Sequence, residues 1–285
     1  MAQGKPIVPR NKENPVGQVA RIRRSSAAIR RQLSAARKLL KAKISSWPFQ
    51  IIETNAKRYE YQISLGELSS VADEILIAMI GESSHELVVS EAMAAYENGT
   101  AQSAVNIGNI SDDYTREITD ILSGAPYQRR VSLISARVFE EMRGFDAQAA
   151  KELSRVLRNA VEVGDNPLSI VGKLSNQFGI SQGRGEKIAR TEITGALRRA
   201  RMDEAEDARQ RQGIRLAMKH FSANSSTTRQ SHAARHGLLF SVQAVREWYA
   251  QDANGINCKC SQVEVLVDES GKEIGAGKKK ARQIN

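Results

Sequence analysis

Residues 185–212, GEKIARTEITGALRRARMDEAEDARQRQ, are followed directly by residues 213–221, GIRLAMKHF, and the spacing of apolar residues changes between the two stretches. In the first stretch, apolar residues recur every three or four positions, which predicts a long helix with one inward face. The inward positions are Ala189, Ile193, Leu197, Ala200 and Ala208. Residues 214–221 alternate and predict a strand. We expect Gly213 to end the helix and to mark the change from helical to mixed structure.

Upstream of this glycine, from about residue 50, the pattern is helical and has almost no strand signals. The expected helices cover residues 51–62, 67–80, 84–98, 100–109, 113–123, 127–143 and 146–162, separated mostly by glycines. Asn166 and Pro167 are an N-cap and a first-turn proline, and they begin a further helix that Gly179 is expected to close. These segments predict a helical domain over residues 46–212.

Downstream, residues 262–267 alternate more clearly than residues 214–221 and run into a turn at 268–271. A short helical piece is expected near residues 229–236. Residues 213–274 therefore predict a small α+β module, and the Gly/Lys-rich residues 275–285 predict a flexible basic tail. The expected fold class is mainly α with a small C-terminal α+β module.

The positive charge of the chain is concentrated at its N-terminus. The whole chain has a net charge of +10, whereas residues 1–45 alone hold twelve Lys and Arg against a single acid, Glu13. Residues 1–17 contain three prolines and predict a disordered lead. Apolar residues at helical spacing from Val19 to Ile44 predict an amphipathic helix, which Trp47 and Pro48 should end.

This pattern predicts a basic N-terminal arm over residues 1–45, with a polyanion or an acidic protein groove as its partner. The candidate DNA-binding or partner-binding residues are Arg21, Arg23, Arg24, Arg30, Arg31, Arg37, Lys38, Lys41 and Lys43. The same helix suits a membrane surface less well, because no Trp or Phe occurs between Val19 and Ile44.

Composition excludes several classes of protein. Hydrophobic residues make up 41% of the 285 residues and aromatic residues 5%, which favours a helical interior over a β-sandwich. The longest apolar run, residues 75–80, is far shorter than the roughly 20 residues of a membrane-spanning helix. The first residues lack a secretory pattern, so we expect a cytosolic chain whose two cysteines are thiols or metal ligands.

Four residues with side chains that can bind a metal ion lie close together in the sequence: His232, His236, Cys258 and Cys260. In a helix the two histidines would share one face, and Cys-x-Cys can supply two thiolates, so the four together would suit a structural zinc ion. Alternatively, one histidine caps a loop and both cysteines are small buried residues. A hydrolytic site would also need a general base and an open metal position, and no His-Glu-x-x-His pattern occurs.

The order of four short segments is more specific. Residues 189–193 (ARTEI), 218–221 (MKHF), 228–232 (TRQSH) with Gly237, and 256–260 (INCKC) together resemble the Mu F-like head-morphogenesis family, the minor head proteins of tailed bacteriophages. The resemblance spans roughly residues 186–268. The residues that carry the family motif are Arg190, Thr191, Glu192, Arg229, His232, Asn257, Cys258 and Cys260.

The resemblance implies a non-enzymatic virion protein in the capsid interior or portal region, present in the host cytoplasm during assembly. Its implied partners are the portal protein, other head proteins and double-stranded DNA, without a membrane. Arg190 or Glu192 would pair with the small module, and Arg229 and His232 would anchor the Ser/Thr loop of residues 222–228, from which they emerge. At His236 the family usually has Asp or Asn, so a shared zinc site would rest on His232, Cys258 and Cys260 alone. The alternative function is a metal-dependent His/Cys nuclease or a DNA-binding regulator.

Overall fold

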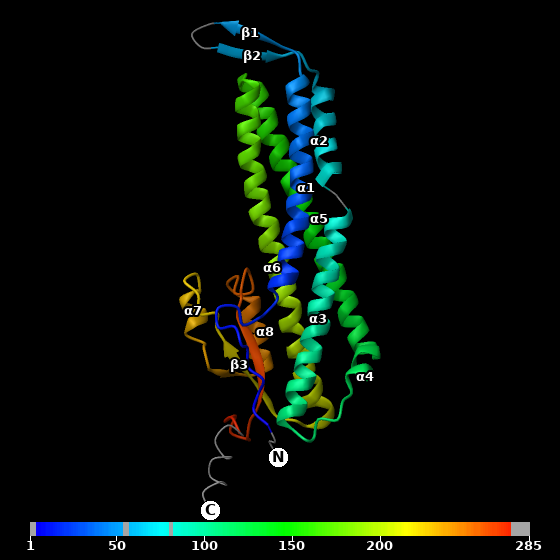
Figure 1. Cartoon of the computed structure of the whole chain (residues 1–285), viewed down its shortest axis with the longest axis vertical. Coiled ribbons are helices and arrows are strands. Elements are labelled where there is room, and N and C mark those ends of the chain that lie inside the picture. The colour runs from blue at the N-terminus through cyan, green and yellow to red at the C-terminus, as the bar shows by residue number, and fades with distance from the viewer. Residues whose placement is uncertain (1–3, 54–56, 80–81, 275–285) are drawn as a thin grey trace, which may run out of the picture. The chain divides into compact units, whose positions relative to one another are not determined.

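The computed structural model describes residues 4–53, 57–79 and 82–274, and Figure 1 shows that most of them are helical. The elements in chain order are α1 (Val19–Ser46), β1 (Phe49–Glu53), β2 (Lys57–Tyr61), α2 (Leu65–Met79), α3 (Glu82–Ile110), α4 (Ile118–Ser123), α5 (Ala125–Val163), α6 (Pro167–Gln212), β3 (Leu216–Phe221), α7 (Gln230–Ala233), β4 (Leu239–Phe240), α8 (Val242–Ala250) and β5 (Ser261–Leu266). The predicted fold class, mainly α with a small C-terminal α+β module, is confirmed. The tail predicted over residues 275–285 lies outside the described residues.

The chain divides into two compact units that do not follow its order. Unit 1 comprises Met1–Ile22, Ser90–Ala136 and Arg190–Asn285, and unit 2 comprises Arg23–Val89 and Arg137–Ala189. The four long helices α1, α3, α5 and α6 each contribute residues to both units. No helix among the described residues is long and apolar enough to cross a membrane.

In unit 2, helix α1 is part of the core rather than an appended arm. Its apolar stripe is buried at Ile29, Leu33, Ala36, Leu40 and Ile44. Helices α1, α5 and α6 meet at Gly185, where an added Cβ would lie 2.9 Å from Ile29 Cγ2 and 3.0 Å from Phe145 Cζ. The predicted amphipathic helix and its end before Pro48 are therefore present. Its apolar face is buried in the core of unit 2, so the helix is not a separate arm.

Residues 51–62 were expected to be a helix. Residues 51–53 and 57–61 instead belong to the antiparallel strands β1 and β2, which we call the hairpin and in which Phe49 pairs with Tyr61 and Ile51 with Tyr59. Aromatic and β-branched residues favour strands, and this preference outweighs the weak helical spacing. The Tyr59 N–H donates to Gly164 O at 3.0 Å, so β2 is bound to the turn between α5 and α6. The hairpin lies across the end of unit 2 at which α1 ends and α6 begins (Figure 1).

Several glycines expected to separate helices lie inside them. Residues 84–98 and 100–109 form one helix, α3, through Gly99, and α5 and α6 similarly continue through Gly144 and Gly179. A glycine costs a helix only about 1 kcal/mol relative to alanine, which tertiary packing can offset. At Gly99 the absence of a side chain is required, because a Cβ would lie 2.5 Å from Leu197 O on α6. The helix predicted over residues 113–123 begins later, at Ile118.

The sheet of unit 1 has the strand order β4-β3-β5, with β3 antiparallel to both neighbours. The two alternating stretches are strands, as predicted, and they pair with each other, Leu216 with Leu266 and Phe221 with Ser261. Gly213 follows the end of α6 with φ +68°, a conformation that favours glycine. The sheet and α8 pack against α3 and α6 in one apolar cluster that includes Ile107, Met202, Met218 and Val245.

Residues 4–18, most of which were expected to form a disordered lead, have no regular secondary structure but are hydrogen-bonded within unit 1. The Val16 N–H donates to Lys259 O at 3.2 Å, and Lys12 O accepts from the Asn224 N–H at 2.9 Å. The Ile7 N–H donates to Asn106 Oδ1 at 2.6 Å. Val16 is 3% exposed. The lead therefore follows the surface of the small module and contributes to its packing.

Candidate functional site

Three of the four candidate metal ligands come together in unit 1. His232 lies on α7, and Cys258 and Cys260 lie in the segment that enters β5. All three side chains are buried, and their ligand atoms lie within 4.8 Å of one another. His232 Nδ1 is 3.5 Å from Cys258 Sγ and 3.6 Å from Cys260 Sγ. The structure thus brings His232 together with two cysteines that lie 26 and 28 positions after it in the sequence.

His236 does not belong to this group. Helix α7 ends at Ala233, one turn after it begins, so the spacing of four no longer places both imidazoles on one face. The exposed His236 side chain instead accepts a hydrogen bond at Nδ1 from the Ser222 N–H at 3.2 Å. The candidate set of four ligands is reduced to three, which is the set that the family resemblance left.

Three arginines hold the segment that carries the cysteines, and Arg229 is the first of them. Arg229 donates to the carbonyl oxygens of Ala253, Asn254 and Ile256 at 2.9, 3.0 and 3.1 Å. Residues 252, 253 and 257 have positive φ values of 49°, 54° and 54°, which are unusual for residues other than glycine. Arg229 therefore anchors a loop, but this loop is residues 252–257, whose backbone is strained, and not the Ser/Thr loop that was expected.

Arg198 is the second arginine, and sequence reasoning missed it. Its guanidinium donates to Cys258 O at 3.2 Å and to Cys260 O at 3.3 Å, and it lies 4.5 Å from the centre of the Tyr249 ring. Arg198 is only 4% exposed. It stands seven positions after Thr191 on α6, and this spacing places both residues on the same helical face, a signal that could have identified it.

Arg190 and Thr191 bind the same loop from an earlier turn of α6. Arg190 donates to Asn257 Oδ1 at 2.5 Å, and Thr191 Oγ1 accepts from the Asn257 N–H at 3.0 Å. Glu192 does not share this contact but lies 3.5 Å from Arg199 on its own helix. Apart from Glu192, the residues of the predicted family motif thus meet around one loop, which we call the clamped loop (residues 252–260).

The electrostatic environment of the cluster favours negative charge on Cys258 Sγ, whereas the hydrogen bond with the Cys258 thiol and burial raise the pKa of the Cys260 thiol. The pKa of the Cys258 thiol is lowered by its hydrogen bond with the Cys260 thiol, and Arg198 and His232 act in the same direction. The Cys260 N–H also points at Cys258 Sγ at 3.4 Å. Nearby, burial lowers the pKa of His220 to about 3, with Arg235 acting in the same direction. His220 is therefore neutral at pH 7.

The donor set is one imidazole and two thiols, which is typical of zinc sites. The group of three contains no carboxylate. Three protein ligands leave one metal position open, but a general base for hydrolysis would have to come from outside the cluster. The lack of a base in this group is what favours a structural metal over the nuclease alternative.

The basic residues predicted for DNA or partner binding divide into two groups. Arg21 is paired with Glu91 at 3.0 Å, Arg30 with Glu186 at 3.0 Å, and Lys43 with Glu74. Arg24 is exposed and also has an interaction within the chain. The remaining five are exposed and form no ion pair among the described residues, and they are Arg23, Arg31, Arg37, Lys38 and Lys41.

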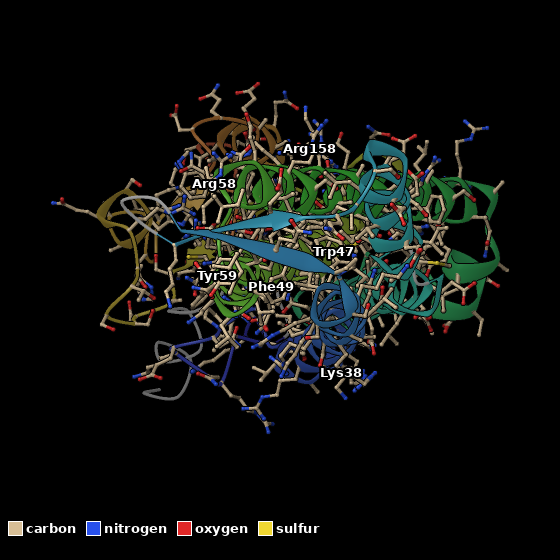
Figure 2. The ribbon with its side chains drawn as sticks, turned by 90° about the horizontal axis from the view of Figure 1, so that it is seen from above. Lys38, Trp47, Phe49, Arg58, Tyr59 and Arg158 are labelled. Atoms are coloured by element: carbon tan, nitrogen blue, oxygen red, sulfur yellow. The ribbon has the colours of Figure 1, made fainter. Side chains whose placement is uncertain are left out.

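Most of the α1 bases in unit 2 share one side of the helix. At 100° per residue, Arg23, Arg30, Arg31, Arg37, Lys38 and Lys41 fall within one sector of about 120° that flanks the buried apolar stripe, and Arg31 and Lys38 are the two that lie directly opposite the stripe. We call this surface the α1 basic face. Figure 2 views the molecule from the hairpin end. Lys38 lies on the outer side of α1, Phe49 and Tyr59 belong to the hairpin, and Arg158 on α5 lies on the far side of the hairpin from Lys38.

Comparison with known proteins bears on the segment that contains the clamped loop. The family model described as Phage Mu protein F like protein matches residues 151–263, a range that includes every residue of the predicted motif. No curated protein and no solved structure gives a significant match to the chain. The matched segment, which makes up less than half of the chain and also holds the contacts that bind α6 to the His/Cys cluster, is similar to the phage Mu protein F-like family of phage head proteins.

Proposed function

We propose that this chain is a structural component of a tailed-phage head that acts at the portal and on packaged DNA during head assembly, and that the α1 basic face binds DNA phosphates. The similarity of residues 151–263 to the head family supports the location in the virion. The DNA contact rests on one observation, the placement of the α1 basic face. The clamped loop and its buried cluster then serve to hold unit 1 together rather than to catalyse a reaction.

The shape of this charge favours a linear polyanion. Residues 23 to 41 span about 27 Å along the helix axis at 1.5 Å per residue. Helix α1 contains no Asp or Glu, so no acidic residue of the helix interrupts the row. An acidic protein groove would be expected to meet a pattern of mixed charge, whereas phosphates repeat with a single sign. We therefore favour DNA over an acidic protein surface as the partner.

The core of unit 2 makes this face rigid. Since the apolar stripe beside this face is buried at Ile29, Leu33 and Leu40, the helix exists before DNA binds. No folding cost is then subtracted from the binding free energy. Helix α1 thus has two roles, because one side builds unit 2 and the other contacts DNA.

The test compares DNA binding by the full chain and by a variant with Arg31→Glu, Lys38→Glu and Lys41→Glu. All three residues are exposed and have no ion pair among the described residues, so the variant should fold. The slope of log K against log salt should become less steep by roughly 3, since each lost phosphate contact removes about 0.9. Binding is measured by fluorescence anisotropy on a labelled duplex over a salt series.

The matched control reverses three exposed bases on α5, Arg129, Lys151 and Arg155, with the same change in net charge. If binding depends on the α1 basic face, the control keeps most of the salt slope. Equal loss in both variants would show that only net charge matters and would overturn the proposal. Recovery of the duplex uncut after incubation with Zn²⁺, Mg²⁺ or Mn²⁺ is expected, and specific cleavage would instead support the nuclease alternative.

A further inference from the structure

We propose that His232, Cys258 and Cys260 bind one Zn²⁺ ion, through the imidazole Nδ1 and two thiolates, and that this ion holds α7 to the clamped loop. The inference does not depend on the DNA contact proposed for α1, because all of its residues lie in unit 1.

The spacing of the donor atoms matches the edges of a zinc tetrahedron. With Zn–S bonds of about 2.3 Å and Zn–N bonds of about 2.0–2.1 Å at tetrahedral angles, the nitrogen and sulfur ligands of one ion lie about 3.5–3.6 Å apart. The distances from His232 Nδ1 to the two sulfur atoms are 3.5 and 3.6 Å. Two of the three edges of the donor triangle therefore already have the length that a bound Zn²⁺ requires.

Packing alone does not account for these residues. His232 is 2% exposed, and its Nε2 has no hydrogen-bond partner among the described residues. Its Nδ1 faces only two thiols, which are weak hydrogen-bond partners. A buried imidazole with so little compensation is costly. A metal–nitrogen bond at Nδ1 would supply the missing stabilisation.

The surroundings of the sulfur atoms suit thiolates bound to a cation. The Cys260 N–H lies 3.4 Å from Cys258 Sγ, and the Tyr249 hydroxyl lies 3.9 Å from the same atom. Arg198 holds the carbonyl groups of both cysteines and so fixes the direction of their side chains. Contacts of this kind orient metal ligands and commonly change metal affinity 10-fold to 100-fold.

The described residues supply three donors, because His236 is turned toward Ser222. A water molecule would complete four-coordination. On binding, each thiol releases one proton to solvent and the imidazole remains neutral, so Zn²⁺ and two thiolates together carry no net charge. Such a neutral centre can be buried without a further counter-ion.

The first experiment measures zinc in the full chain, expressed in zinc-supplemented medium and purified with a reductant and without chelators. Elemental analysis should find one zinc per chain. Exchange for Co²⁺ should produce tetrahedral visible bands and a thiolate charge-transfer band. A wild-type protein that holds no zinc, and that shows no cobalt spectrum when Co²⁺ is added to the reduced protein, would overturn the proposal without any variant.

Two substitutions then identify the ligands. Cys260→Ser should lose the bound zinc, whereas His236→Gln should keep the full equivalent and the cobalt spectrum. His236 is the matched control, because it is the second histidine of the same segment but lies outside the group of three. Loss of zinc in His236→Gln would overturn the three-residue assignment. Full zinc retention by Cys260→Ser would exclude this thiolate as a ligand and would likewise overturn it.

Discussion

Arg201 and Glu264 form an ion pair that is almost completely removed from water. Their side chains are 6% and 0% exposed, and Arg201 Nε lies 3.0 Å from Glu264 Oε1. Ser103 and Asn106 each donate a further hydrogen bond to the carboxylate at 2.8 Å. The pair joins α6 to β5, so the helical part of unit 1 and its sheet meet through a fully paired charge.

We expect Glu264→Ala to destabilise unit 1 by about 3–5 kcal/mol, because it leaves the Arg201 guanidinium buried without a partner. The double variant Arg201→Met, Glu264→Met should cost much less than the sum of the two single changes. The free energy of unfolding in urea is the measurement. The exposed pair Arg209 and Glu206 is the control, where Glu206→Ala should cost less than about 1 kcal/mol. Similar losses at both pairs would contradict this account.

Two glycines inside helices should respond oppositely to alanine. Gly99→Ala places a Cβ 2.5 Å from Leu197 O and should cost about 1–3 kcal/mol through overpacking. Gly144→Ala meets no atom within 4 Å on the solvent side of α5 and should gain about 0.5–1 kcal/mol. Thermal unfolding monitored by circular dichroism distinguishes them. The prediction fails if both changes shift the melting temperature in the same direction.

Loss of the Arg229 anchor should loosen the clamped loop. Arg229→Ala removes three hydrogen bonds to loop carbonyls and should cost about 1–3 kcal/mol. Arg229→Lys should retain only part of this stabilisation, because a single ammonium group cannot form the hydrogen bonds of the planar guanidinium. The rate of proteolytic cleavage within residues 252–257 reports the change. Arg215→Ala, which removes an exposed pair with Glu269, should leave that rate unchanged.

The buried His220 should make unit 1 sensitive to mild acid. Its pKa is lowered to about 3 in the folded protein, against about 6.5 in an unfolded chain, so the unfolded state binds more protons below pH 6.5. Stability is therefore complete above pH 6.5 and falls as the pH decreases, by at most about 1.4 kcal/mol per pH unit. Urea unfolding between pH 7 and pH 5 measures this slope, with a chelator present to exclude bound metal.

The control for this measurement is His220→Asn, in which the amide oxygen can replace Nδ1 as acceptor for the Gln262 side chain. This variant should flatten the pH dependence in the same window. An unchanged slope in His220→Asn would assign the acid sensitivity to other groups.

Sequence reasoning predicted those features that depend on neighbours along the chain. The periodic spacing of apolar residues identified α1 and the C-terminal half of α6, and alternation identified β3 and β5. It misplaced helix boundaries at Gly99, Gly144 and Gly179, because a glycine's local cost is small and only the packing partner decides whether the helix continues. It also predicted a helix where Phe49–Glu53 pairs with Lys57–Tyr61, since cross-strand pairing is not visible as a local period.

For the candidate site, the sequence alone determined the residue types, a Cys-x-Cys pair and a histidine in the order of a phage head family. Only the tertiary structure decided which histidine joins the cysteines, because a helical turn that ends at Ala233 directs His232 toward them and leaves His236 outside. The tertiary structure also revealed that Arg198 binds the carbonyl groups of both cysteines and that α1 is part of the core of unit 2. Burial and long-range hydrogen bonds depend on the distance between segments in space, and that distance is set by packing of the whole unit rather than by any one stretch of sequence.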